Sequence, residues 1–299
     1  MDAVSLRGIS KVFGTQRAVD ALTMDVPAGS IFGLLGPNGS GKTTTIRMIL
    51  KILLPDEGTV QVFGRELDEA SKDQIGYLPE ERGLYKGMRV EDHLAFFGAL
   101  HGLAPLEARR RARAWLERLE AGEWATRKIQ ELSKGMQQKV QFIGTILHDP
   151  ILVILDEPFA GLDPVNTRLL KDVMLELRER GSTVIFSTHQ MEQVEKSCDR
   201  ICLIHKGHAV VQGPLAEIRQ EHGGNTVHLE YSGELPRHAI ENLLESIDDH
   251  GHYAELRLRR PEDTNLLLRY LVDAVEVRRF ELSEASLDDI FIRLVEGRK

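Results

Sequence analysis

The segment from Gly36 to Thr44, with the sequence GPNGSGKTT, constrains the fold of this chain more than any other. It matches G-x-x-x-x-G-K-[ST], the phosphate-binding P-loop, in which a glycine-rich turn joins a strand to a helix. The flanking residues fit, because an apolar run at 30–35 precedes the loop and a helical pattern at 44–50 follows it. A glycine-rich turn with a surface lysine is the alternative, and this context argues against it. We therefore predict that the chain binds a nucleoside triphosphate.

The residue types of this loop suit a polyphosphate. Glycines let the backbone wrap closely around phosphate oxygens, and the following helix N-terminus offers amide donors and a positive dipole. Lys42 would place a charge near the β- and γ-phosphates, and Thr43 would offer a hydroxyl to Mg²⁺. The predicted ATP-binding segment consists of Gly36, Pro37, Asn38, Gly39, Ser40, Gly41, Lys42, Thr43 and Thr44.

A pair of acids follows a second buried run. Phosphoryl transfer to water needs a carboxylate on the metal side and a base that orients the attacking water. The apolar run 151–155 ends in Asp156 and Glu157. Asp156 is the candidate carboxylate for Mg²⁺, and Glu157 is the candidate catalytic base. Two acids that merely end a strand are the alternative, which their position downstream of a P-loop disfavours.

The pattern around these motifs predicts an α/β core. The runs 151–155 and 183–187 are continuously apolar, as is typical of central parallel strands covered on both faces. A helix is expected between them, with Asp163 as its N-cap, Pro164 at its first position and Gly181 just past its end. We expect its buried stripe to consist of Val165, Leu169, Val173 and Leu177.

Two further parts surround this core within a nucleotide-binding domain expected at 1–220. Residues 3–65 read as short alternating strands around the P-loop, an antiparallel β subdomain, and about 82–150 read as a helical subdomain. Its helices are expected at 90–100 and 105–119. The second helix is expected to bury Leu106, Trp115, Leu116 and Leu119, and its cluster Arg109, Arg110, Arg111 and Arg113 favours a solvated face over an acidic-lipid or partner patch.

A boundary is predicted near 221–225, followed by a small α+β domain at 224–299. Alternating strands are expected at 226–231, 254–259 and 275–282, with helical patterns at 236–248, 262–273 and 286–296. Ser286 and Asp289 form a capping-box pattern at the start of the last helix. This domain carries no recognisable catalytic motif.

Composition and sequence patterns argue against several classes of protein. The chain has 299 residues, enough for more than one domain, and its net charge of −8 argues against nucleic acid as a partner. Cys198 and Cys202 lack the partner ligands of a zinc site and read as reduced packing residues of a cytosolic protein. No apolar run approaches the length of a membrane span, and the acidic start does not resemble a signal peptide.

On its ordered motifs, the chain from about residue 3 to 218 resembles the ATP-binding subunits of ABC transporters. The segment 132–139, LSKGMQQK, looks like the signature sequence of that family, upstream of the Asp156–Glu157 strand. The resemblance implies that Ser133 and Gly135 present helix N-terminal amides to the nucleotide of an opposing subunit. Lys134 and Met136 depart from the usual signature.

The same resemblance assigns further roles. Residues 161–163 look like the D-loop that meets the partner subunit, and His189 looks like the switch histidine that touches the γ-phosphate. Phe13 takes the place of the aromatic that stacks on adenine, with a core aromatic as the alternative. Glu80 stands where the family has its Q-loop glutamine; ionised, it approaches Mg²⁺ or its water but cannot donate a hydrogen bond.

The runs 78–85 and 284–291 resemble bacterial subunits that serve ABC-2-type exporters of the sodium-extrusion and drug-efflux kind. This implies a homodimer or paired ATPase that sandwiches two ATP–Mg²⁺ and drives a separate integral membrane permease. The subunit would then be cytoplasmic, attached to the inner face of the membrane through that permease. Two alternatives remain: an ABC ATPase acting on ribosomes or DNA, and a sensor whose tail regulates or dimerises it. The transported substrate cannot be identified from the sequence.

Overall fold

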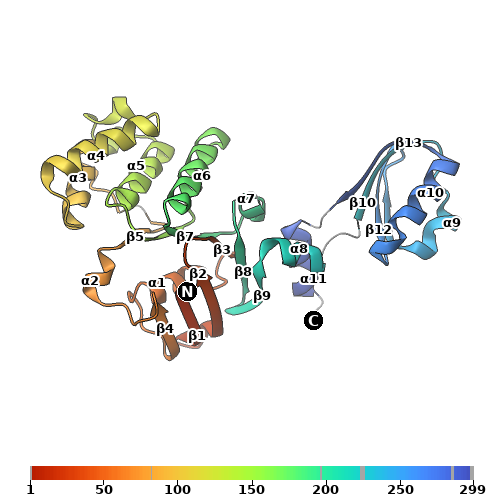
Figure 1. The fold of residues 1–299 in the computed structure, drawn as a ribbon, viewed down its shortest axis with the longest axis horizontal. Helices are drawn as coiled ribbons and strands as arrows, with labels where there is room; N and C mark the ends of the chain where they lie inside the picture. The colour runs from red at the N-terminus through yellow and green to blue at the C-terminus, as the bar shows by residue number, and fades with distance from the viewer. Residues whose placement is uncertain (1, 82, 196, 223–225, 284–285, 297–299) are drawn as a thin grey trace. The chain divides into compact units, whose positions relative to one another are not determined.

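The computed structural model describes all residues except 1, 82, 196, 223–225, 284–285 and 297–299. The chain divides into two compact units, Met1–Gly213 and Pro214–Lys299. This division lies some residues before the boundary predicted near 221–225, and residues 223–225 of that boundary lie outside the described residues. Figure 1 shows the order of the elements along the chain.

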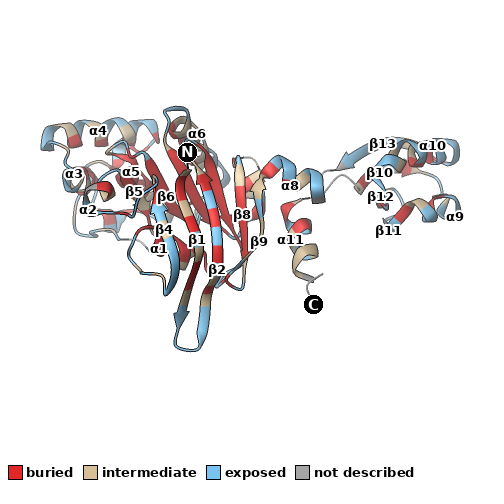
Figure 2. Ribbon diagram, turned by 60° about the horizontal axis from the view of Figure 1, so that its bottom comes forward, coloured by how far each residue is buried: buried red, intermediate tan, exposed pale blue. Residues whose placement is uncertain are grey.

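A six-stranded sheet in the order β5-β6-β7-β3-β8-β9 forms the centre of the first unit. The neighbouring pairs from β5 to β8 are parallel, and every residue of the central strands β3, β6 and β7 is buried. Buried residues are red in Figure 2, for example in the strand labelled β6. The two predicted central strands are therefore confirmed. The strands are β3 (Ile31–Leu35), β5 (Ile75–Leu78), β6 (Leu152–Asp156), β7 (Thr183–Thr188), β8 (Arg200–His205) and β9 (His208–Pro214).

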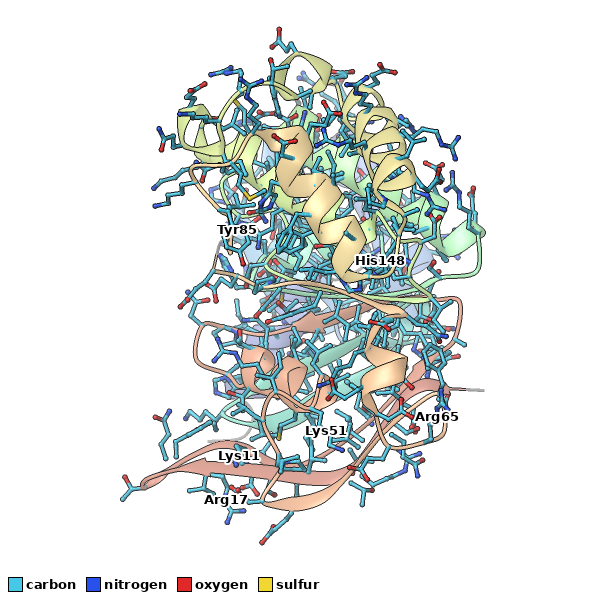
Figure 3. The ribbon with its side chains drawn as sticks, turned by 90° about the vertical axis from the view of Figure 1, so that its left-hand side faces the viewer. Lys11, Arg17, Lys51, Arg65, Tyr85 and His148 are labelled. Carbon is cyan, nitrogen blue, oxygen red and sulfur yellow. The ribbon has the colours of Figure 1, made fainter. Side chains whose placement is uncertain are left out.

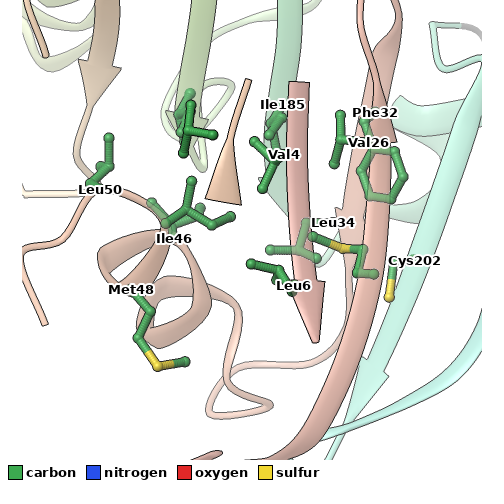
Figure 4. Packing of buried hydrophobic residues seen from close by; sticks show 14 of the residues in the cluster. Val4, Leu6, Val26, Phe32, Leu34, Ile46, Met48, Leu50, Ile185 and Cys202 are labelled. Carbon is green, nitrogen blue, oxygen red and sulfur yellow. The ribbon is translucent and has the colours of Figure 1, made fainter. Parts of the chain in front are cut away.

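A second sheet, antiparallel and ordered β2-β1-β4, packs over the P-loop helix. Its strands are β1 (Asp2–Phe13), β2 (Gln16–Pro27) and β4 (Glu57–Val62), the first two longer than the short strands expected. Side chains from both sheets meet in one apolar core with helix α1 (Lys42–Ile49), for example Leu6, Leu34 and Ile46 (Figure 4). This shared core fixes the P-loop between the two sheets. Cys202 belongs to it, and both cysteines are free thiols.

The segment 82–150 is helical in its described part. Helices α3 (Val90–Leu100) and α4 (Pro105–Arg118) confirm the two expected there, and α5 (Lys134–Ile146) follows two 3₁₀ turns, Gly122–Trp124 and Ile129–Glu131. The expectation that Leu106 is buried is wrong, because its side chain is 82% exposed. The buried face of α4 follows Ala108, Ala112 and Leu116 at a spacing of four, and Leu106 points to the opposite side.

The arginine cluster on α4 faces solvent as expected, and each guanidinium is paired with an acid. Arg109 contacts Asp92 at 2.8 Å, and Arg110 and Arg111 both contact Glu107. Arg113 reaches Glu91 on α3 at 3.0 Å. The pairs of Arg109 with Asp92 and of Arg110 with Glu107 lie toward solvent and contribute little to stability individually, whereas Glu91 is buried and Arg111 is half-buried. The cluster is therefore a charge-compensated helix face whose outer guanidinium groups are solvated.

Helix α6 (Pro164–Glu179) has the expected ends, since Asp163 accepts a hydrogen bond from the Asn166 amide at 2.9 Å and Gly181 has φ +96°. The predicted stripe is wrong at Val165, which is 73% exposed. A spacing of four residues drifts by 40° per step on a 3.6-residue helix, so the stripe leaves the core face after three steps. The buried positions are Leu170, Val173, Met174 and Leu177. The short helices α2 (Glu69–Lys72) and α7 (Met191–Glu195) complete this unit.

The second unit is α+β, as predicted. Its four strands form an antiparallel sheet ordered β11-β12-β10-β13. From β10 to β13 the elements follow each other along the chain as β-α-β-β-α-β, the split βαβ arrangement. An apolar core lies between this sheet and α10, and Val227, Leu256 and Leu267 belong to it. The elements are α8 (Leu215–His222), β10 (Thr226–Ser232), α9 (Arg237–Ile240), β11 (Leu244–Asp249), β12 (Tyr253–Leu258), α10 (Thr264–Ala274), β13 (Glu276–Ser283) and α11 (Leu287–Glu296), with 3₁₀ turns at Glu241–Leu243 and Pro261–Asp263.

The helix predicted at 236–248 is wrong beyond Ile240. Leu244–Asp249 is strand β11, whose Ile247 pairs with Leu256 of β12. Pairing with β12 overrides the local helical pattern, because it buries Leu244 and satisfies the backbone in the sheet. The predicted cap of α11 is confirmed, since the Asp289 amide donates to Ser286 Oγ at 3.1 Å. In the part of the chain that the structure describes, no helix has both the length and the apolar character needed to span a membrane.

Candidate nucleotide-binding and hydrolysis site

The P-loop runs from the end of β3 to the start of α1, and its glycines are required by packing as well as by conformation. Gly36 has φ +148° and Gly41 has φ +111°, values that L-residues rarely adopt. A Cβ atom on Gly36 would lie 2.1 Å from the carbonyl oxygen of Ile204, and one on Gly41 would lie 2.5 Å from that of Ala18. The loop is therefore pressed against β8 on one side and β2 on the other.

The other side of the loop is open and offers donors. A Cβ atom on Gly39 would meet nothing within 4 Å, so this part of the backbone faces free space. Helix α1 begins without a side-chain cap and without an acid in its first turn, which leaves its amides and positive dipole end for an anion. Ser40 Oγ is buried and has no hydrogen-bond partner among the described residues. These features fit a polyphosphate.

Lys42 is buried at the first position of α1. Its Nζ donates hydrogen bonds to the carbonyl oxygens of Gly36 at 2.8 Å and Pro37 at 3.2 Å. It also lies 3.7 Å from Oε1 of Glu157. Burial lowers the pKa of Lys42 from its ordinary value, and the nearby Glu157 and Asp156 carboxylates partly oppose that shift. The ammonium is thus held at the loop by groups that the more strongly anionic oxygens of a phosphate can replace.

Asp156 is the last residue of β6 and is fully buried. Its Oδ1 accepts a hydrogen bond from the Ser187 hydroxyl, whereas its Oδ2 has no partner within the described part of the chain. A buried carboxylate oxygen without a partner is costly, so this atom fits a metal ion or a metal-bound water.

The donor set suits Mg²⁺ held partly by a nucleotide. Mg²⁺ in phosphate-transferring sites takes one or two protein ligands and completes its shell with phosphate oxygens and water. Asp156 and the half-buried Thr43 hydroxyl at the start of α1 can supply that share. Among the described residues no group of three or more His, Cys, Asp or Glu side chains could hold a metal by itself, in keeping with such shared coordination.

Glu157 connects the catalytic candidates. Its carboxylate oxygen Oε1 lies 3.0 Å from Nδ1 of His189, in addition to its contact with Lys42. Its backbone has φ +51°, a strained value for a non-glycine residue, and its amide donates to the carbonyl oxygen of Ser187 at 3.2 Å and to the hydroxyl at 3.1 Å. The structure therefore brings together Lys42, Glu157 and His189, the three residues predicted to be catalytic.

Ser187 has a role that the sequence reasoning missed. Its hydroxyl donates to Asp156 and accepts from the Glu157 amide, so one side chain orients both acids. The only sequence signal is a hydroxyl side chain at 187 near the end of an otherwise apolar run at 183–187. Its partners lie about thirty positions upstream, and only the pairing of β6 with β7 brings them together.

Glu80 and Phe13 lie at the edges of the site. Glu80 is exposed, two residues beyond the end of β5, and its charge acts on Lys42 to raise the pKa of that lysine. Phe13 ends β1 and is 48% exposed, so the alternative of a core aromatic is wrong. The Lys11 ammonium lies 5.9 Å from the centre of its ring. The aromatic side chain of Phe13 is therefore available for stacking.

The signature-like segment lies at the start of α5. Ser133 is the N-cap of this helix, and its Oγ accepts a hydrogen bond from the Met136 amide at 3.3 Å. A Cβ atom on Gly135 would lie 3.2 Å from the carbonyl oxygen of Gly161, so this segment packs against the predicted D-loop. Ser133 and Gly135 thus stand on elements other than those that carry the P-loop and the two acids.

Two family models match this chain. The model described as ABC transporter matches residues 19–160, which include the P-loop, the signature-like segment and both acids. The model described as ATP-binding protein DrrA1-3-like, C-terminal domain, matches residues 213–295, which is nearly the whole second unit.

Similar proteins and solved structures agree with the match to the ABC transporter model. The uncharacterized ABC transporter ATP-binding protein YhaQ of Bacillus subtilis (strain 168) is 43% identical over 291 residues, covering 96% of each chain. The daunorubicin/doxorubicin resistance ATP-binding protein DrrA of Streptomyces peucetius is 32% identical, covering 98% of this chain and 92% of that protein. A solved structure titled "Structure of ATP binding subunit of ABC transporter" is 32% identical with a TM-score of 0.68, covering 73% of this chain and 92% of the other.

Proposed function

This chain belongs to the ATP-binding subunits of ABC transporters, which are ATPases, and from that premise we propose that it powers export through a separate membrane permease. Similarity to DrrA, a daunorubicin/doxorubicin resistance protein, extends over nearly the whole chain and favours export over import. The match of the second unit to a DrrA-like C-terminal domain supports the same subgroup. The transported substrate of this chain is not assigned.

The contact of Glu157 with both Lys42 and His189 is the observation that carries the hydrolytic assignment. Lys42 binds the β- and γ-phosphates of ATP, Glu157 takes the proton of the attacking water, and His189 contacts the γ-phosphate. A base that contacts both a phosphate-binding lysine and a histidine would lie beside the terminal phosphate of bound ATP. Phe13 stacks on adenine.

Thr43 and Asp156 would hold Mg²⁺, and Glu80 would approach the ion or its water. When bound, the ion neutralises charge on the β- and γ-phosphate oxygens. Ser187 keeps the Asp156 carboxylate in a single orientation through its hydrogen bond. The remaining oxygen of this carboxylate, Oδ2, would therefore be available to Mg²⁺.

A pair of ATPase subunits completes each site. The amides at the start of α5, near Ser133 and Gly135, bind the phosphates of ATP held by the P-loop of the opposing subunit. Within one chain Gly135 packs against Gly161 and Leu162, and neither Ser133 nor Gly135 belongs to the P-loop. Two copies of this chain, or one copy and a related subunit, supply the arrangement.

An exposed aromatic group marks the surface that we assign to the permease. Tyr85 is 54% exposed and packs edge-on against His93 and Phe96 at ring-centre distances of 5.9 and 5.6 Å. Figure 3 shows Tyr85 beside α3, whose exposed Leu100 extends the apolar surface. This aromatic group follows the Glu80 segment closely in sequence. Movement of a permease helix bound here would therefore shift the Glu80 segment next to the nucleotide site. The chain then acts at the inner face of the membrane, attached through an ABC-2-type permease.

The test is purification of the tagged chain from detergent-solubilised native membranes, followed by mass spectrometry. We expect a polytopic membrane protein in near-equal amount. A cysteine-attached photo-cross-linker on a Tyr85→Cys variant should capture that protein. The same reagent on an Arg17→Cys variant, in the β1–β2 hairpin, should not. Recovery of ribosomal or DNA-repair proteins, with the chain absent from membranes, would instead support an ABC ATPase of the ribosome or of DNA. No relative reported above favours that alternative.

A further inference from the structure

Helix α5 carries three buried polar side chains on one face. Gln138, Gln141 and Thr145 follow each other at spacings of three and four residues, which places them on a single stripe. The other fully buried positions of this helix include the apolar Val140, Phe142 and Ile143. A buried polar stripe must find hydrogen-bond partners on the facing elements.

Those partners are backbone carbonyls next to the two candidate acids. Gln138 Nε2 donates to the carbonyl oxygen of Pro158 at 3.1 Å, immediately after Glu157. Gln141 Nε2 donates to that of Pro79 at 3.3 Å, immediately before Glu80. The hydroxyl of Thr145 donates to the carbonyl oxygen of Gln141 within the helix at 3.0 Å and lies 3.4 Å from that of Tyr77 in β5. One helix face is thus bonded to both segments that carry a carboxylate.

Packing leaves little freedom between α5 and β5. A Cβ atom on Gly76 in β5 would lie 2.3 Å from the carbonyl oxygen of Thr145, so the helix backbone touches the strand directly. Glu80 follows β5 after only one intervening residue, Pro79, whose ring restricts the backbone. A displacement of α5 is therefore passed to the Glu80 segment through Gln141 and through this contact.

Glutamine is not the residue that would make position 141 most stable. Its Oε1 is buried and has no hydrogen-bond partner among the described residues, so its desolvation is uncompensated. An unbranched apolar side chain of similar length would avoid that cost. What such a side chain cannot supply is the directional bond to Pro79.

We propose that Gln141 is a positioning residue for ATP hydrolysis, which ties the Glu80 segment to the helix that starts at Ser133. Binding of the opposing subunit's nucleotide at the start of α5 thereby sets the position of Glu80 beside the phosphates. This inference rests on the proposed roles of Glu80 and Ser133. Gln138 supports the same coupling on the Glu157 side.

The first test replaces Gln141 by methionine, which keeps the length and removes the amide. We expect kcat to fall about 10–100-fold, in the range typical of residues that orient a metal ligand, while the KM for ATP changes little. The Mg²⁺ concentration that gives half the maximal rate should rise. The melting temperature should stay the same or increase, since the variant no longer buries an unpaired oxygen.

Ser182 provides a matched control. Its hydroxyl also donates to a proline carbonyl, that of Pro150 at 2.8 Å, at the end of β6 remote from Asp156. A Ser182→Ala variant should keep its kcat and its Mg²⁺ dependence. Equal losses of kcat in Ser182→Ala and Gln141→Met would show a general packing effect and overturn the proposal.

A double-mutant cycle with Glu80→Ala identifies the route, because alanine removes the side-chain oxygens that either a glutamate or a glutamine would offer. If Gln141 acts through Glu80, Gln141→Met should slow the wild type but add little loss to Glu80→Ala. Equal losses in both backgrounds would overturn the proposal, and so would an unchanged kcat in Gln141→Met. If Glu80→Ala itself hydrolyses ATP at the wild-type rate, the proposed role of Glu80 fails and this inference fails with it. A slow Glu80→Ala with a fast Gln141→Met would overturn only the inference.

Discussion

The ammonium of Lys42 lies 3.7 Å from the carboxylate of Glu157, although the two residues come from different motifs more than a hundred positions apart. Both side chains are buried, so their charges attract each other more strongly than they would in water. The pair joins the phosphate-binding loop to the candidate base. A terminal phosphate bound by Lys42 therefore comes within reach of Glu157.

Replacement of Lys42 by alanine should weaken ATP binding about 10–100-fold. The variant loses charge-assisted hydrogen bonds to phosphate, which contribute about 1.5–3 kcal/mol each. Titration with a fluorescent ATP analogue measures the change. Lys72→Ala, which removes an exposed lysine paired with Glu69, is the control and should bind normally. Unchanged affinity in Lys42→Ala would refute the phosphate-binding assignment.

Replacement of Glu157 by glutamine should preserve ATP binding and reduce kcat by at least about 10²-fold. The amide keeps the shape of the side chain but cannot accept the proton of the attacking water. ATP should then hold the variant as a dimer, which sedimentation with and without ATP can detect. Glu179→Gln, at an exposed position of α6, should hydrolyse ATP normally. Wild-type turnover by Glu157→Gln would show that another group is the base.

Replacement of Ser187 by alanine should lower kcat about 10–100-fold, because both acids lose a hydrogen bond that orients them. The P-loop is untouched, so ATP affinity without Mg²⁺ should remain normal. Steady-state kinetics across a Mg²⁺ titration separate the two effects. A variant with full kcat at every Mg²⁺ concentration would mean that β6 and β7 alone position the acids.

These residues also show what a sequence can predict. The P-loop and the strands around it were predictable because their causes are local: glycine conformations, continuous apolar runs and an acid pair at a strand end. Ser187 and Gln141 were not, since each acts on residues that only the fold brings close. The same limit explains β11, where pairing with β12 outweighed a helical pattern.

Acid should destabilise the first unit through its buried histidines. Burial lowers the pKa of His93 and of His148 to about 4, from an ordinary value of 6.5. The neutral forms are favoured in the folded state, whereas the unfolded chain takes up protons below pH 6.5. The contribution of these histidines to the free energy of unfolding is therefore greatest above pH 6.5, and it falls as the pH drops toward 4.

Urea unfolding of the full chain at pH 7.5, 6 and 5 checks this dependence. His93→Phe should flatten it by removing one of the histidines whose pKa is lowered by burial, and the ring fits among Tyr85 and Phe97. His238→Gln, at an exposed position, should leave the dependence unchanged. A pH slope in His93→Phe as steep as in the wild type would assign the effect to other groups.

Ser133 has two candidate roles, which one substitution can separate. Its hydroxyl caps α5 within its own chain, so Ser133→Ala would lose about 1 kcal/mol of stability as well as any contact with phosphate. Ser133→Asp keeps a good N-cap and suits the helix dipole, but it repels a phosphate. We expect this variant to melt like the wild type, to bind ATP at its own P-loop, and to lose both ATP-dependent dimerisation and hydrolysis. Asp68→Ser, the reverse exchange at the cap of α2, should hydrolyse ATP normally. Wild-type hydrolysis by Ser133→Asp would leave Ser133 as a helix cap alone and remove the hydroxyl from the proposed composite site.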